Sequence, residues 1–196
     1  MKIMKKLTLL FVVTLGLLVG CKTDSTTSTS TEMPVAALMS DNTLSDITLN
    51  DTTINSSYYE FGYEFNVTKN GKITQLGTHI PDASTVRVTV WDLSDTSVIA
   101  QASISALAHT AKYVTLATPV SLIVGKKYAV TILSNDWYYR HRPGFIDYVY
   151  PITKGNITFT KYGYSSASSL DPAIYPISFN NADINGIGDF TFETVN

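Results

Sequence analysis

The residues best suited to contact a ligand are concentrated between Asn135 and Tyr150, where the sequence reads NDWYYRHRPGFIDYVY. Trp and Tyr rings present broad apolar faces with a polar edge, which suits stacking on sugar rings or contact with a protein partner. Arginine can donate hydrogen bonds to sugar hydroxyls. The Pro143-Gly144 pair indicates a turn or an exposed loop. The candidate ligand-binding residues are Trp137, Tyr138, Tyr139, Arg140, Arg142 and Tyr148.

The same segment is compatible with packing into a core. If it forms a strand, Trp137 and Tyr139 share one face, while Tyr138 and Arg140 share the other. One of these faces would then belong to the core. Ligand contact and structural packing therefore both remain open for this segment.

A second segment, Asn181 to Asp189, resembles part of a calcium-binding loop. Oxygen-bearing side chains occupy its first, third and fifth positions, glycine the sixth and a carboxylate the ninth. Asp183, Asn185 and Asp189 are the candidate ligands. The loop begins with Asn, however, and Phe192 stands at the twelfth position in place of a glutamate. A polar turn built on Asn185-Gly186 is the favoured interpretation, and no cofactor is expected.

Motifs for catalysis are sparse. The sequence contains no HExxH pair, G-x-S-x-G elbow, P-loop or dinucleotide fingerprint. Asp136 and Asp147 flank the aromatic segment and could form the carboxylate pair of a glycosidase, although each is more typical of a loop or turn. A binding or structural role is therefore favoured over an enzyme.

The elements that would position these residues are predicted to be strands. Phe61, Tyr63 and Phe65 alternate with small or polar residues, and Val86, Val88 and Val90 repeat the pattern. Asn70-Gly71 predicts a hairpin turn. Turn residues separate such runs about every ten positions, as in a sandwich or barrel. We predict an all-β fold, a single antiparallel β-sandwich over residues 34–196, with few or no long helices.

The N-terminus reads as an export signal. Lys2, Lys5 and Lys6 precede the apolar run Leu7–Val19, which as a helix would span about 20 Å, less than the roughly 30 Å hydrocarbon core. Leu18-Val19-Gly20-Cys21 resembles the bacterial lipobox. The resemblance implies cleavage of residues 1–20 and acylation of Cys21, which would anchor the chain to the lipid bilayer. Residues 21–33 are rich in Ser and Thr and predict a flexible tether.

The composition of the chain excludes some classes of binding partner and metal site. The chain has 196 residues with a formal net charge of −2 and a single cysteine. This balance disfavours a nucleic-acid partner, which requires clustered basic residues. One cysteine excludes an intrachain disulfide and any multi-thiolate metal site.

Several segments, in order, are similar to an uncharacterised family of bacterial extracellular domains. They are Phe61-Gly62-Tyr63-Glu64-Phe65, Gly71–Gly77, Val88-Thr89-Val90-Trp91-Asp92, Tyr113–Val120 and Gly125-Lys126-Lys127-Tyr128. The resemblance covers about half of the mature chain. It implies a jelly-roll-like sandwich related in shape to carbohydrate-binding modules. It does not extend past Leu133, so the aromatic segment inherits no role from it.

Three functions follow as hypotheses. The first is a binding module of the cell envelope, at the outer membrane or cell surface, that recognises glycan through the aromatic and arginine residues. The second is a structural or interaction subunit that uses the same residues against an envelope protein. The third, least favoured for want of a motif, is an enzyme acting on polysaccharide.

Overall fold

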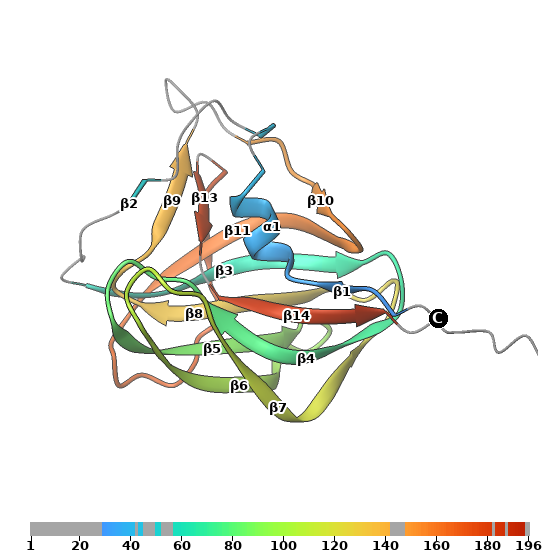
Figure 1. Cartoon of the computed structure of the whole chain (residues 1–196), viewed down its shortest axis with the longest axis horizontal. Helices are drawn as coiled ribbons and strands as arrows, with labels where there is room; N and C mark the ends of the chain where they lie inside the picture. The colour runs from blue at the N-terminus through green and yellow to red at the C-terminus, as the bar shows by residue number, and fades with distance from the viewer. Residues whose placement is uncertain are drawn as a thin grey trace, which may run out of the picture.

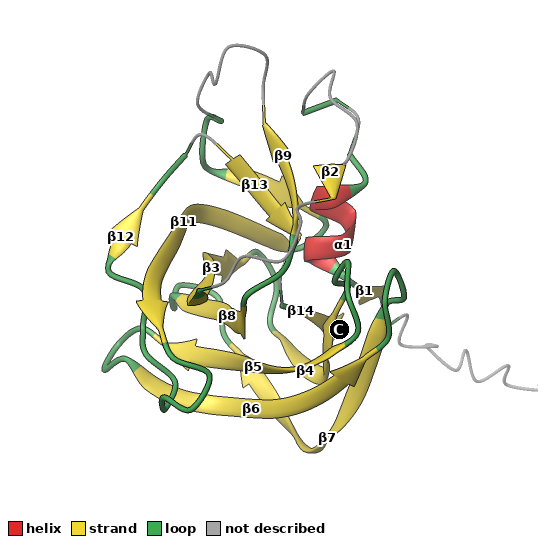
Figure 2. Cartoon of the chain, turned by 90° about the vertical axis from the view of Figure 1, so that its left-hand side faces the viewer, coloured by secondary structure: helices red, strands yellow, loops and turns green. Residues whose placement is uncertain are grey.

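The chain is an antiparallel β-sandwich with a small third sheet at one end (Figures 1 and 2). The computed structural model describes residues 29–41, 43–44, 50–51, 57–141, 148–181, 183–186 and 188–194. Every strand pairing within this part of the chain is antiparallel. The predicted all-β sandwich is confirmed.

The sandwich consists of a four-stranded and a seven-stranded sheet. The smaller sheet has the order β1 (Thr31–Glu32), β14 (Asp189–Thr194), β4 (Gly71–Thr78) and β7 (Lys112–Leu122). The larger sheet has the order β10 (Ile152–Lys154), β11 (Ile157–Ala167), β3 (Tyr58–Val67), β8 (Tyr128–Ser134), β5 (Ser84–Asp92) and β6 (Ser97–Ala106), and β12 (Ser178–Phe179) pairs with β11.

The third sheet and a short helix lie together at one end of the molecule in both views (Figures 1 and 2). The sheet has the order β13 (Asp183–Gly186), β9 (Tyr138–His141) and β2 (Asn50–Asp51). The helix is α1 (Pro34–Met39). Pro34 stands at its first turn, where the fixed φ of proline favours helix and its missing N–H costs nothing.

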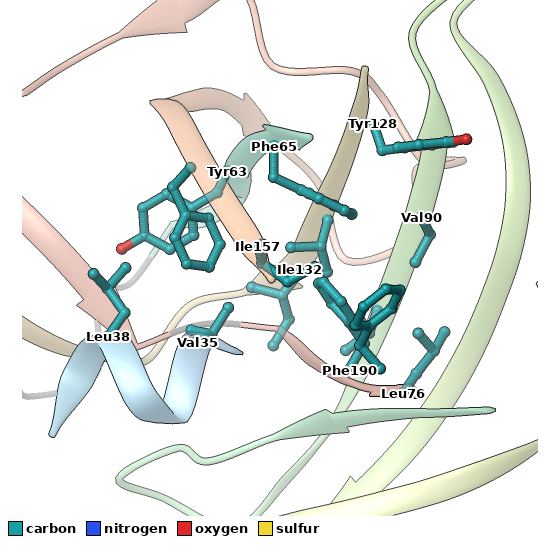
Figure 3. Close-up of a cluster of buried hydrophobic side chains, with 14 of the residues drawn as sticks. Val35, Leu38, Tyr63, Phe65, Leu76, Val90, Tyr128, Ile132, Ile157 and Phe190 are labelled. Atoms are coloured by element: carbon teal, nitrogen blue, oxygen red, sulfur yellow. The ribbon is translucent and has the colours of Figure 1, made fainter. Parts of the chain in front are cut away.

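The core lies between the two large sheets, where the predicted alternation of β3 buries Phe61, Tyr63 and Phe65. The Phe65 ring stacks on Phe190 of β14, with centroids 5.0 Å apart, so the pair joins the two sheets (Figure 3). Burial of each such side chain stabilises the fold by about 1.5–3 kcal/mol. Val35 and Leu38 of α1 extend the same core toward the third sheet (Figure 3).

The predicted hairpin at Asn70-Gly71 is wrong, because β3 and β4 belong to different sheets. A two-residue hairpin of this type needs positive φ at both central residues, and neither Asn70 nor Gly71 has it. Glycine is required at position 71 for another reason: a Cβ there would lie 2.4 Å from Cζ of Phe192. The close approach of two strands, rather than a turn, explains this residue.

The last residues of the predicted tether belong to the sandwich. Thr31 and Glu32, which the sequence pattern places at the end of the tether, form β1 and pair with Glu193 and Phe192. The Glu32 carboxylate also accepts a hydrogen bond from the Asn156 backbone amide at 2.7 Å. The N-terminal part of the domain is therefore fixed to its last strand before α1 begins.

Candidate functional site

Charged side chains from two distant strands hold the two ends of α1. Asp189 of β14 accepts hydrogen bonds from the amides of Val35 and Ala36, each at 3.0 Å. At the other end, Arg140 of β9 donates to the carbonyls of Met39 and Asp41 at 2.8 and 2.9 Å. The carboxylate satisfies free N–H groups of the first turn, and the guanidinium satisfies free carbonyls of the last. The position of this six-residue helix is thus set by tertiary contacts.

A cavity of about 260 Å³ lies between α1, the ends of β4 and β7, and the third sheet. Its walls are largely apolar and include a few polar residues. The lining residues are Val35, Ala36, Met39, Ser40, Thr78, His79, Ala111, Tyr113, Tyr138, Gly186 and Asp189. An apolar pocket with a few placed polar groups is the usual form of a small-molecule site.

Tyr113 reaches Asp189 by crossing the intervening strand at a glycine. Gly77 of β4 pairs with Tyr113 on one side and with Asp189 on the other. A Cβ at Gly77 would lie 2.2 Å from the Tyr113 ring, so only glycine lets that ring lie across the strand. The Tyr113 hydroxyl then donates to Asp189 Oδ2 at 2.8 Å. Tyr113 and Asp189 of this row line one wall of the cavity.

The pKa values of Asp189 and Tyr113 are both shifted by their surroundings in this wall. Burial raises the pKa of Asp189, and donation by the Val35 amide and the Tyr113 hydroxyl opposes that rise. Burial and the neighbouring carboxylate raise the pKa of Tyr113 well above its ordinary value. Tyr113 therefore stays protonated at neutral pH and remains a donor to Asp189.

Thr78 is the most informative residue of the cavity. It is 1% exposed, and its hydroxyl has no hydrogen-bond partner within the described chain. A buried polar group without a partner costs roughly 1–3 kcal/mol. A ligand that bonded to this hydroxyl would recover that cost.

Two aromatic residues, His79 and Tyr138, also line the cavity. The His79 and Tyr138 rings lie 4.8 Å apart between centroids at an interplanar angle of 40°. His109 Nδ1 and the Tyr138 hydroxyl are 2.6 Å apart, which fixes the orientation of the tyrosine. Tyr138 is thus held by two histidines at the edge of the cavity.

The predicted aromatic and arginine loop is not presented as one exposed surface. Tyr138 lines the cavity, Arg140 is 2% exposed and caps α1, and Tyr148 is buried. The reason is that β9 lies between β2 and β13, which makes part of the segment a central strand.

Trp137 and Tyr139 are half-buried. The Trp137 ring packs edge-on against Phe61 and Tyr59, with centroids 5.0 and 6.1 Å away. Structural packing therefore accounts for most of the predicted set. Arg142 and Cys21 lie outside the described residues, as does Asp147.

The structure corrects both interpretations of residues 181–189. Residues 183–186 form neither the calcium-binding loop nor the polar turn at Asn185-Gly186. Residues 183–186 form β13, paired with β9. The Asn185 backbone exchanges hydrogen bonds with the Tyr63 hydroxyl, both at 2.8 Å, and Asp189 is occupied by α1 and Tyr113. Asp183 lies in the same strand. Among the described residues, no group of three or more His, Cys, Asp or Glu side chains could hold a metal ion.

The carboxylates considered for hydrolysis do not form a described pair. Asp136 is buried, and its Oδ2 accepts a hydrogen bond from the Asp82 amide at 2.7 Å. It serves to fix the chain before β5. Within the described residues, no helix is both long enough and apolar enough to cross a membrane.

Sequence reasoning missed most of the cavity. Pro34 followed by an apolar run was a local signal for the start of α1. Thr78, Tyr113 and Asp189 carry no shared local signal, since they come from three strands that only the fold brings together.

Comparison with known proteins identifies the domain. The family model described as "Domain of unknown function (DUF4082)" matches residues 47–180, which include most of the sandwich and the aromatic segment. No protein with a curated description matches the chain. Because the match covers more than half of the sequence, this chain belongs to the DUF4082 family.

Proposed function

We propose that this protein is a non-catalytic binding module of the bacterial cell envelope, anchored through acylated Cys21, and that its cavity receives one neutral sugar unit of a glycan. The observation that carries the proposal is the unpartnered Thr78 hydroxyl in the wall of a largely apolar cavity. The aromatic and arginine residues act mainly as the frame of this cavity.

The size of the cavity supports a single ring as ligand. Its volume of about 260 Å³ lies just below the roughly 300 Å³ at which sites for drug-sized molecules begin. A longer glycan would therefore enter by one terminal unit. The remainder would extend into solvent.

The lining matches the two kinds of surface on a sugar ring. The apolar side chains Val35 and Met39 and the Tyr138 ring suit the C–H groups. The Thr78 hydroxyl suits a sugar hydroxyl, because either partner can donate.

The charge of the lining supports a neutral ligand. Among the residues that the structure describes, the cavity lining contains no lysine or arginine, and its carboxyl group, that of Asp189, accepts hydrogen bonds from the Val35 amide and the Tyr113 hydroxyl. An acidic sugar would meet this carboxyl group without a compensating cation.

A protein-interaction role is the second candidate. Leu170 and Ile177 are 92% and 79% exposed, and Phe179 is half-exposed on the nearby β12. Large apolar side chains on a surface are typical of a contact with another protein. This candidate predicts retention of a specific envelope protein that Leu170→Ser and Ile177→Ser abolish.

The cavity hypothesis is tested with the full chain in lipid nanodiscs on an array of neutral and acidic glycans. We expect binding to a subset of neutral terminal sugars. Thr78→Val keeps the size of the side chain but removes the hydroxyl, and it should weaken binding about tenfold. Ala111→Phe should fill the cavity and abolish binding.

Trp137→Ala and Tyr139→Ala provide the matched comparison, since neither residue lines the cavity. If these two variants abolish binding and Thr78→Val does not, the ligand binds at the aromatic segment and not in the cavity. Silence across the array would overturn the glycan proposal.

The anchor is tested separately by metabolic labelling with palmitate. We expect the label on the wild-type protein and none on Cys21→Ala, because the thiol is the proposed site of acylation. Lys22→Ala is the control and should keep the label. Labelled Cys21→Ala protein would contradict the anchor.

A further inference from the structure

A second depression, of about 290 Å³, lies on the face of the large sheet that is turned away from the core. It is bounded by β3, β5, β6 and β8 and by the chain that follows β11. Its polar lining residues are Tyr58, Thr85, Arg87, Gln101, Ser103 and Ser169. None of the described lining residues carries a carboxylate. This composition contrasts with the described lining of the first cavity, which has a carboxyl group and no arginine.

Arg87 is held in a fixed orientation beneath the depression. Nη2 donates to Glu60 Oε2 at 2.7 Å, and Nη1 donates to the Asp171 carbonyl. The Nε atom is buried and has no partner within the described chain. The side chain keeps 19% of its surface exposed. A guanidinium fixed by two contacts needs little reordering to bind a further acceptor.

A chain of hydrogen bonds holds Glu60 behind the arginine. Trp91 Nε1 donates to Thr131 Oγ1 at 3.0 Å, and Thr131 Oγ1 donates to Glu60 Oε1 at 2.6 Å. Glu60 is fully buried and so cannot turn toward the depression. The two acids near Arg87 are thus engaged, since the Asp171 carboxylate accepts from the Ser168 amide at 2.6 Å.

Three of the other polar groups of the depression are hydroxyls that can donate hydrogen bonds. The hydroxyls of Tyr58, Ser103 and Ser169 have no partner within the described chain. Ser103 pairs directly with Arg87 across β5 and β6, so the two side chains are neighbours on the same face of the sheet. Gln101 Nε2 donates a hydrogen bond to Thr89 Oγ1 at 3.1 Å, and the residue is exposed. Several hydroxyl donors and one guanidinium, whose partner Glu60 is buried behind it, suit a ligand that accepts hydrogen bonds.

We propose that this depression binds a small oxyanion, with Arg87 and the Ser103 and Tyr58 hydroxyls as its donors. The chemistry is shared by a sugar carboxylate and by a phosphate group. The site lies on the opposite face of the large sheet from the core, and it stands independently of the proposed sugar cavity. A chain with both sites would contact a neutral and an acidic group at once.

The test is calorimetric titration of the full chain in zwitterionic nanodiscs with glucuronate, glucose and inorganic phosphate. We expect glucuronate to bind, glucose not to bind through this site, and the affinity for glucuronate to fall as salt is raised. Equal binding of phosphate supports an oxyanion site of broad selectivity, and binding of glucuronate alone assigns the site to carboxylates.

Variants that preserve the Arg87–Glu60 pair keep the test interpretable, because removing Arg87 would leave Glu60 buried without its partner. Ser103→Glu places a negative charge beside Arg87 at an exposed position and should weaken glucuronate binding at least tenfold. Ser121→Glu adds the same charge on β7, outside the depression, and should leave binding unchanged.

Three results would overturn the proposal: no oxyanion binds, glucose binds as well as glucuronate in the Thr78→Val background, or Ser103→Glu behaves as Ser121→Glu does. Thr78→Val by itself should leave glucuronate binding unaltered. Failure of the sugar cavity and failure of the oxyanion site are therefore separate outcomes.

Discussion

The carboxylate of Asp189 lies 3.0 Å from the amide nitrogen of Val35, so that a residue of the last strand caps the first turn of α1. The two residues are 154 positions apart in the sequence. The same carboxylate accepts from Ala36, Tyr113 and Phe190. One side chain thereby joins the helix, the last strand and the wall of the candidate cavity.

Replacing Asp189 with asparagine should destabilise the domain and release α1. The variant keeps one acceptor oxygen but turns an amide N–H₂ toward donors that need an acceptor. We expect the free energy of unfolding to fall by about 1.5–3 kcal/mol, the range for hydrogen bonds to charged groups. Chemical denaturation measures the loss, and amide exchange at Val35 and Ala36 reports the release of the helix.

Asp92→Asn is the matched control for this prediction, because its carboxylate bonds to Ser94 and Lys126 at the surface. It should leave exchange at Val35 and Ala36 unchanged. Equal exchange in the two variants would show that Asp189 does not hold α1.

Arg140 is predicted to matter for the shape of the cavity rather than for direct contact with ligand. Arg140→Met leaves the carbonyls of Met39 and Asp41 without their donor in a buried setting. We expect a loss of about 2–3 kcal/mol in unfolding free energy. Weaker sugar binding should accompany the loss, since Met39 and Ser40 line the cavity.

Arg140→Lys separates a structural role from a ligand-binding role. The lysine restores one donor to the carbonyls, so stability and sugar binding should recover together in part. A variant with wild-type stability and no sugar binding would instead place Arg140 in contact with the ligand.

The contrast between β3 and the aromatic segment shows how far the sequence predicts this molecule. The alternation of Phe61, Tyr63 and Phe65 is a local property, and the structure buries all three as expected. Tyr138 and Arg140 stand in a segment whose aromatic and arginine content indicated an exposed binding loop. Their exposure depends instead on pairing with β2 and β13, which come from elsewhere in the chain. Aromatic composition alone cannot distinguish a surface loop from a strand between two partners.

Local sequence patterns could not predict the cavity, for a related reason. Tyr113 meets Asp189 only because β4 separates β7 from β14 and carries a glycine at the crossing point. The pairing order of three strands is a global property of the fold. The sequence patterns placed Gly71 in a turn and Gly77 in a strand segment. In the structure, each glycine is needed because an aromatic ring lies where a Cβ would be.

Gly71→Ala tests this interpretation of the glycines. An added methyl group would collide with the Phe192 ring and with the Glu193 carbonyl, and we expect a loss of about 1–3 kcal/mol in unfolding free energy. In a double-mutant cycle, Phe192→Leu should reduce the cost of Gly71→Ala, because the two sites share one contact. Strict additivity would show that the ring is not the obstacle.

Glu60 gives the domain a pH dependence with a defined sign. Its pKa is raised above the ordinary value of 4.5 because burial disfavours the carboxylate, while Thr131 and Arg87 oppose the rise. An acid with a raised pKa in the folded state contributes stability that is present below pH 4.5 and is lost as pH rises through the folded-state pKa. Urea midpoints of the wild type and Glu60→Gln, measured from pH 4 to pH 8, isolate this contribution. The stability of the wild type relative to the variant should decline as pH rises, and an increase over that range would mean that the Arg87 and Thr131 contacts outweigh burial.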